Sequence, residues 1–275
     1  MNRALQLLLV ASLFGGLTGP ARAADEAAAN DHRPTLWIIG DSTVKNGSGK
    51  GSDGLWGWGD PIAEYFDKSK ITVANRALGG RSSRTYFTEG LWDKVLTGVK
   101  PGDFVLMQFG HNDGGPLTGG RARASLKGNG QETQDVTDQK TGKKETVHTY
   151  GWYIRKYVAD AKARGATPIV CSPIPRNMWK AGKVARASND YGKWAAEAAK
   201  AENVPFVDLN ERIAARYETL GEERVKIFFP GDHTHTNLAG AQLNASIVVE
   251  GLKALKDCPL ATYLSPDTPK PDKAE

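Results

Sequence analysis

The chain has 275 residues and a formal net charge of +5, and hydrophobic residues make up 40% of it. The charge is spread without a dense run of lysine and arginine, which argues against a nucleic-acid-binding protein. Without residues 1–23, which hold two arginines and no acid, about 250 residues with a net charge of about +3 remain, enough for one large α/β domain.

Residues 1–23 have the features of a secretory signal peptide. Arg3 provides a positive start, an apolar run follows that is too short to span a bilayer comfortably, and small residues around Ala23 suit a signal peptidase. No cysteine directly follows the run to carry a lipid anchor. We therefore expect a secreted or periplasmic protein that has no membrane attachment after signal cleavage.

Five short, apolar, β-rich segments follow, and helical patterns lie between them. Most of these segments are continuous apolar runs, which are typical of a parallel sheet buried on both faces. The alternation predicts an α/β, flavodoxin-like three-layer sandwich with a central five-stranded parallel sheet and ligands at the carboxyl ends of its strands. The predicted strands are residues 36–40, 71–77, 104–109, 167–171 and 205–209, and the predicted helices are 58–68, 84–99, 153–164, 187–202 and 238–255.

We expect one domain over residues 32–258. A polar insert at 114–148 interrupts it, and the second half of this insert predicts a hairpin around a turn at 140–143. Long loops inside compact domains are commonly functional or disordered. The proline-rich and charged residues 264–275 predict a disordered tail.

The two cysteines are too few for a disulfide framework. Cys171 lies in an apolar strand, where a buried thiol is expected, and Cys258 follows the last predicted helix. Export would permit a disulfide between them, and the sequence leaves open whether one forms.

Polar or glycine-rich motifs follow the first three predicted strands. Ser42, in GDST, lies where α/β folds bind ligands, although a serine there can also cap a helix. Gly80, in LGGRS, allows a ligand to approach the backbone closely. Asn112, in GHND, could donate an amide N–H to an oxyanion. His111 and Asp113 are candidate positioning residues, and for His111 a purely structural role is the favoured alternative.

A fourth motif, PGDHTHTN, precedes the last predicted helix. Asp232 and His235 are three residues apart, so the carboxylate can bond one imidazole nitrogen and leave the other facing a serine. This is the pair of orienter and base that a serine nucleophile requires. Zinc binding by His233 and His235 is the competing interpretation, but the other histidines are scattered. We expect no metal and no other cofactor.

Together the four motifs resemble those of the SGNH (GDSL-type) hydrolases. The invariant residues of that superfamily match Ser42, Gly80, Asn112 and His235, in that order. More closely, GDSTV, GGRSSRT, GHNDGG and FPGDHTHTN resemble the rhamnogalacturonan acetylesterases, family 12 of the carbohydrate esterases. The resemblance implies the SGNH hydrolase fold and Ser42 as nucleophile. It also implies His235 as the base that Asp232 orients, and an oxyanion hole of Ser42, Gly80 and Asn112.

Such enzymes deacetylate rhamnogalacturonan, a pectin backbone, so the resemblance implies a secreted carbohydrate acetylesterase without an obligate protein partner. Arg81, Arg84 and Trp179 are then candidate substrate contacts, and Arg176 and Lys180 are further cations for galacturonate carboxylates. The alternatives are a xylan acetylesterase, a short-chain lipase or arylesterase, and a non-catalytic glycan-binding protein. The polar insert argues against a lipase, which needs an apolar lid, and the complete residue set argues against a pure binding protein.

Overall fold

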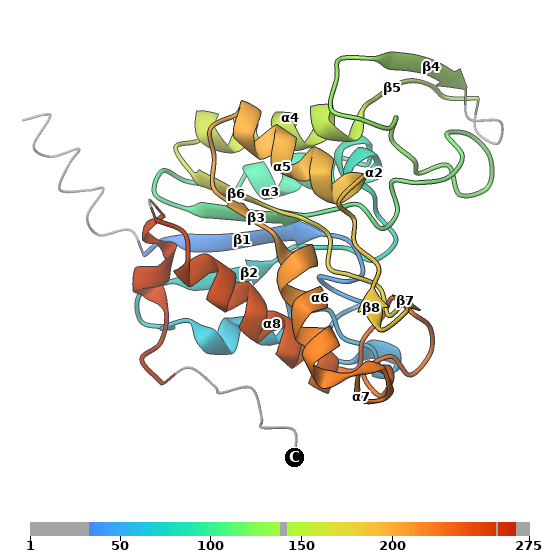
Figure 1. Ribbon diagram of the computed structural model, residues 1–275. Coiled ribbons are helices and arrows are strands. Elements are labelled where there is room, and N and C mark those ends of the chain that lie inside the picture. Colours follow the sequence, from blue (N-terminus) through green and yellow to red (C-terminus); the bar gives the residue numbers. More distant parts are fainter. Residues whose placement is uncertain (1–32, 138–141, 257, 268–275) are drawn as a thin grey trace, which may run out of the picture. The chain divides into compact units, whose positions relative to one another are not determined.

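The computed structural model describes residues 33–137, 142–256 and 258–267 (Figure 1). The predicted signal peptide at residues 1–23 and most of the predicted tail lie outside these ranges. Within them, no helix is long and apolar enough to cross a membrane.

The fold is built on a five-stranded sheet in which all neighbouring strands are parallel, in the order β2-β1-β3-β6-β9. Counted along the chain this is the order 2-1-3-4-5 of flavodoxin-like folds, so the predicted fold class is confirmed. The direction of winding reverses between β1 and β3, where such folds bind their ligands. The strands are β1 (Thr35–Gly40), β2 (Thr72–Asn75), β3 (Phe104–Gln108), β6 (Thr167–Cys171) and β9 (Phe206–Val207).

Helices cover both faces of the sheet and complete the three layers (Figure 1). Successive strand side chains point to opposite faces. Leu36 and Ile38 of β1 therefore enter one apolar core, and Ile39 enters the other. One face carries α2 (Ser83–Thr88), α3 (Leu91–Leu96), α4 (Tyr150–Ala163) and α5 (Tyr191–Ala201). The other carries η2 (Pro61–Tyr65), α6 (Leu209–Leu220), α7 (Glu222–Lys226), α8 (Leu238–Lys253) and η3 (Pro259–Tyr263).

Two predicted helices differ from the structure. The predicted helix at 84–99 is divided into α2 and α3 at Gly90, whose φ of 68° lies outside the helical region. The predicted helix at 58–68 is reduced to the 3-10 helix η2. Phe66 leaves η2 in an extended conformation and forms a bridge with Leu264, which stops the helix. Both patterns therefore predicted the buried residues better than the helix lengths.

The insert between β3 and α4 contains the hairpin that its sequence predicts. Its strands β4 (Thr133–Thr137) and β5 (Lys144–His148) pair antiparallel. Val147 of β5 is fully buried, whereas most other side chains of the hairpin are exposed. Part of the predicted turn, residues 138–141, lies outside the described residues. A second, shorter hairpin of β7 (Trp179–Lys180) and β8 (Lys183–Val184) follows β6.

The fold continues past the predicted boundary at residue 258. Leu260 of η3 is fully buried in the core, and the Ser265 N–H donates to the carbonyl oxygen of Tyr65 at 2.9 Å. The predicted tail, which starts at 264, therefore begins too early, because Leu264 and Ser265 pair with the end of η2.

Both cysteines are buried and free. The prediction of a buried thiol at Cys171 is thereby confirmed, since this residue lies in the central sheet. Burial raises the pKa of the Cys171 thiol well above its usual range, so the residue acts as a small apolar side chain.

Candidate active site

Ser42, His235 and Asp232 form a continuous line of hydrogen bonds. His235 Nε2 lies 2.8 Å from Ser42 Oγ, although the two residues are 193 positions apart. On the other side of the ring, Nδ1 lies 2.7 Å from Oδ2 of Asp232. In this arrangement the imidazole can take the hydroxyl proton while the carboxylate holds the ring in place.

The carboxylate of Asp232 is fixed by its own loop. Its Oδ1 accepts hydrogen bonds from the backbone N–H groups of Thr234, at 2.6 Å, and His235, at 2.7 Å. Partial burial alone would raise the pKa of Asp232, but these bonds, the bond from the His235 ring and the charge of that ring lower it to about 2. Asp232 is therefore ionised at neutral pH and can stabilise an imidazolium.

Backbone contacts bring the loop after β1 against the loop before α8. The Trp56 N–H donates to the Thr236 carbonyl at 2.8 Å, and the Thr236 hydroxyl donates to the Trp56 carbonyl at 2.9 Å. The Asn177 N–H donates to the carbonyl of His233 at 2.8 Å. Asn237 caps α8 by accepting from the N–H of Gly240. The loop that holds Asp232 and His235 is thus attached on both sides of the motif.

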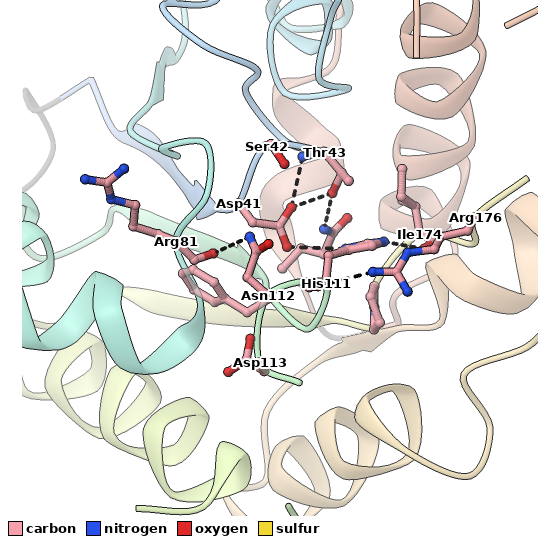
Figure 2. A network of polar contacts seen from close by, with 12 residues as sticks. Asp41, Ser42, Thr43, Arg81, His111, Asn112, Asp113, Ile174 and Arg176 are labelled. Carbon is pink, nitrogen blue, oxygen red and sulfur yellow. Dashed lines mark hydrogen bonds and ion pairs between the residues drawn. The ribbon is translucent and has the colours of Figure 1, made fainter. Parts of the chain in front are cut away.

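Three candidate N–H donors belong to Ser42 and to the loops that follow β2 and β3. The backbone N–H groups of Ser42 and Gly80 have no acceptor within the described part of the chain. Asn112 uses one amide hydrogen to reach the Arg81 carbonyl at 2.9 Å, which leaves its second amide hydrogen available (Figure 2). A Cβ placed on Gly79 would lie 3.6 Å from the Cβ of Ser42, so the two loops are in contact. Such a group of donors can stabilise a developing oxyanion.

A buried contact between Asp41 and His111 lies beside the serine (Figure 2). Asp41 is fully buried, its Oδ1 accepts from the N–H and hydroxyl of Thr43, and its Oδ2 lies 3.3 Å from His111 Nδ1. Burial alone would raise the pKa of Asp41, but the charge of His111 and these hydrogen bonds lower it overall. His111 Nε2 faces the carbonyl of Ile174 at 3.0 Å. Both ring nitrogens of His111 therefore face acceptors, and the ring is held between the Asp41 carboxylate and the Ile174 carbonyl.

A family model described as the GDSL-like lipase/acylhydrolase family matches residues 38–243. The chain belongs to this family. The resemblance that the four sequence motifs predicted is therefore confirmed. The match begins within β1 and ends within α8, so it covers the second half of β1 and the other four strands of the sheet completely.

Individual relatives of this GDSL-family chain include carbohydrate esterases. The rhamnogalacturonan acetylesterase of Emericella nidulans is 34% identical over 218 residues, which cover 79% of this chain and 84% of the relative. The probable rhamnogalacturonan acetylesterase YesY of Bacillus subtilis is 32% identical over 225 residues, 80% of this chain and 93% of the relative. The crystal structure of Bacillus subtilis YxiM matches with a TM-score of 0.65 at 26% identity, covering 81% of this chain and 56% of that chain.

The GDSL-family site also depends on polar residues that the sequence analysis did not identify. Gln108, at the end of β3, accepts from the Trp58 indole at 2.8 Å and donates to the Thr43 hydroxyl at 2.7 Å. It is a polar residue at the end of an otherwise apolar strand, a signal that could have been recognised. Asp41 is the other such residue, since it directly precedes the serine and is fully buried.

Asp113 joins the site to the insert. Its carboxylate is fully buried and accepts from the N–H and hydroxyl of Ser83 and, at 3.0 Å, from the hydroxyl of Ser125. Burial raises the pKa of Asp113 to about 6, although the hydrogen bonds from both serines act in the opposite direction. Asp113 directly follows Asn112, so a carboxyl group with a pKa of about 6 lies in the same loop as Asn112.

Arg84 does not contact the open site, so this predicted substrate contact is wrong. The residue is 3% exposed, and its Nε and Nη2 bond both oxygens of Glu145 at 2.7 and 2.9 Å. Its Nη1 donates to the carbonyls of Leu117 and Ala124. Arg84 therefore ties the insert to α2, because a buried guanidinium requires a carboxylate partner.

The other candidate substrate contacts differ in their surroundings. Arg81 is partly exposed and pairs with Glu89 at 2.9 Å. The indole of Trp179 donates to the side chain of Asn177 at 2.7 Å and packs against the core. Arg176 donates to the His111 carbonyl at 3.2 Å and lines a pocket of about 180 Å³. Lys180 is exposed.

Within the described ranges, no group of three or more metal-ligating side chains could hold an ion.

Proposed function

We propose that this chain is a serine esterase that removes O-acetyl groups from a polysaccharide, and that its substrate is the rhamnogalacturonan backbone of pectin. The line of hydrogen bonds from Asp232 through His235 to Ser42 carries the proposal. The two relatives named as rhamnogalacturonan acetylesterases, at 34% and 32% identity, support this choice of polysaccharide.

In the proposed mechanism, Ser42 Oγ attacks the carbonyl carbon of the acetyl ester while His235 Nε2 takes the hydroxyl proton. The carbonyl oxygen becomes an oxyanion, which accepts hydrogen bonds from the Ser42 and Gly80 N–H groups and the Asn112 amide. Each such donor is typically worth about 3 kcal/mol in the transition state. His235 then returns the proton to the sugar oxygen, which leaves, and the acetyl group stays on Ser42.

The second half of the reaction repeats the first with water. His235 takes a proton from a water molecule that attacks the acetyl-serine, and collapse of the intermediate releases acetate and restores Ser42. Both halves begin with a neutral imidazole. The ionised Asp232 keeps the hydrogen on Nδ1, so that the lone pair of Nε2 faces the serine.

The test is acetate release from acetylated rhamnogalacturonan, acetylated xylan and an aryl acetate. We expect the native protein to act fastest on rhamnogalacturonan and Ser42→Ala to lose nearly all turnover. A faster reaction on xylan would replace the proposed substrate, and undiminished turnover by Ser42→Ala would refute the nucleophile. Labelling of Ser42 by an organophosphonate distinguishes an esterase from a glycan-binding protein of the same fold.

Export is part of the proposal. Arg3, the apolar run and the small residues before position 24 support removal of residues 1–23 and a secreted or periplasmic protein. The mass of the protein that is recovered outside the cytoplasm of its host should match that of the chain without residues 1–23. Recovery of the full-length chain in the cytoplasm would contradict export.

A further inference from the structure

Arg123 belongs to the insert and lies beside the glycine loop that follows β2. Its Nη1 donates to the Gly80 carbonyl at 3.1 Å, and a Cβ placed on Gly80 would lie 3.6 Å from the same nitrogen. The preceding residue, Gly79, approaches the Cβ of Ser42 to the same distance when it is given a Cβ. The positively charged Arg123 therefore lies next to Gly80, and the adjacent Gly79 lies next to Ser42.

The backbone next to Arg123 is held firmly. The Ala124 carbonyl accepts from Arg84 at 2.9 Å, the Ser125 N–H donates to the Asp113 carbonyl at 3.1 Å, and the Ser125 hydroxyl reaches the Asp113 carboxylate. Both Ala124 and Ser125 are buried. The position of the guanidinium is thus set by the core of the site rather than by the exposed hairpin.

Among the described residues, Arg123 has no carboxylate partner within ion-pair distance. In the described part of the chain, its guanidinium bonds only the Gly80 carbonyl, and no acid lies within 4.0 Å. Burial and the charge of Arg121 lower its pKa, although the more distant charges of Asp41 and Asp113 act in the opposite direction, and an arginine stays charged in proteins. By contrast, Arg81 pairs with Glu89 at 2.9 Å and Arg84 pairs with Glu145 at 2.7 Å, whereas Arg176 bonds the His111 carbonyl.

We infer that Arg123 is a specificity-determining residue whose guanidinium binds the carboxylate of an acidic sugar in the acetylated polysaccharide. The inference rests on the proposed esterase function and gives the insert a part in substrate choice. A guanidinium presents its N–H groups in a planar fork that matches a carboxylate. One N–H is bonded to Gly80, which leaves the others available. A neutral polysaccharide offers no group that would satisfy them equally well.

The alternative is that Arg123 only holds the Gly80 carbonyl in place. Loss of such a structural contact would slow the reaction on every ester to the same extent. Loss of a carboxylate contact would instead act on acidic substrates, mainly through KM, and would respond to salt. The two roles therefore predict different ratios of activity on matched acidic and neutral substrates.

The experiment compares the activity of the intact mature protein on two polymers. One is rhamnogalacturonan, and the other is the same polymer with its carboxylates reduced to alcohols, and both are chemically acetylated to the same degree. The native protein is compared with Arg123→Gln, Arg123→Lys and the charge-matched control Lys127→Gln, an exposed residue of the same insert. Measurements of kcat and KM at low and high NaCl give the ratio of kcat/KM for the acidic polymer to that for the neutral one.

We expect Arg123→Gln to lower this ratio about tenfold through KM, Arg123→Lys to lower it less, and Lys127→Gln to leave it within about twofold. The activity of the native protein on the acidic polymer should fall with salt more steeply than that of Arg123→Gln. An equal loss on both polymers, or an unchanged ratio in Arg123→Gln, would overturn the inference. If the native protein hydrolyses an aryl acetate but neither polymer, the proposed substrate fails and this inference fails with it.

Discussion

The buried carboxyl of Asp113 should make the stability of the protein depend on pH. The pKa of Asp113 is raised from 3.8 to about 6 in the folded state, because burial disfavours the charged form. Below the lower value the group is protonated in both states. Between the two values only the unfolded chain ionises, so the free energy of unfolding falls as pH rises, and it stays reduced above the higher value. A shift of about two pKa units corresponds to about 3 kcal/mol.

The variant Asp113→Asn isolates this contribution. Asparagine has no proton to lose, so relative to the native protein the variant should gain about 3 kcal/mol of stability between about pH 4 and about pH 7. It also replaces one acceptor oxygen near Ser83 by a donor, which costs a constant amount at every pH. Only the change with pH is therefore diagnostic.

The measurement is urea unfolding followed by tryptophan fluorescence at both pH values, for the native protein, Asp113→Asn and the control Asp93→Asn at an exposed position. Other groups such as Asp41 and Asp232, whose pKa values are lowered, cancel in the comparison. A difference between native protein and Asp113→Asn that stays the same at both pH values would refute the reasoning.

Three further predictions concern the site and the insert. Asn112→Ala should lower kcat about 10²- to 10³-fold with little change in KM, which steady-state kinetics on an aryl acetate measures; an unchanged kcat would remove Asn112 from the oxyanion hole. His111→Phe should lower kcat and Tm together, because the fully buried carboxylate of Asp41 would lose a hydrogen-bond partner. A normal Tm would show that this contact does not stabilise the fold. Glu145→Gln should destabilise the protein by about 2 to 3 kcal/mol in urea unfolding, because it leaves the charge of Arg84 unpaired, and Glu132→Gln on the exposed part of the insert serves as the control.

The sequence predicted the sheet well because a parallel sheet leaves a local signal. Strands buried on both faces must be continuously apolar, and most of the five predicted segments were such runs. Helix lengths were predicted less well. One predicted helix is interrupted by the left-handed conformation of Gly90, and another is stopped where Phe66 pairs with Leu264, and the apolar pattern shows neither. No helix was predicted over residues 209–226, where α6 and α7 lie. In α6, Leu209, Ile213, Tyr217 and Leu220 recur at helical spacing, so this helix could have been recognised from the sequence.

The candidate site divides in a similar way. Ser42, Gly80, Asn112 and the motif with Asp232 and His235 were identifiable because each follows a strand or precedes a helix. The topology then brings strand ends to one edge of the sheet. The buried partners of these residues were harder to find, since Gln108 and Asp41 act through contacts with residues far away in the sequence.

From the sequence alone, the fold class, the family and the residue types available for chemistry could be predicted, because these depend on local apolar patterns and short motifs. Only the tertiary structure decided which charged side chains are free to meet a substrate. Arg84 and Arg123 are both arginines near the site, yet one is paired with Glu145 and the other bonds only the Gly80 carbonyl among the described residues. The reason is that a charge is neutralised by its neighbours in space, and those neighbours come from segments that the fold brings together.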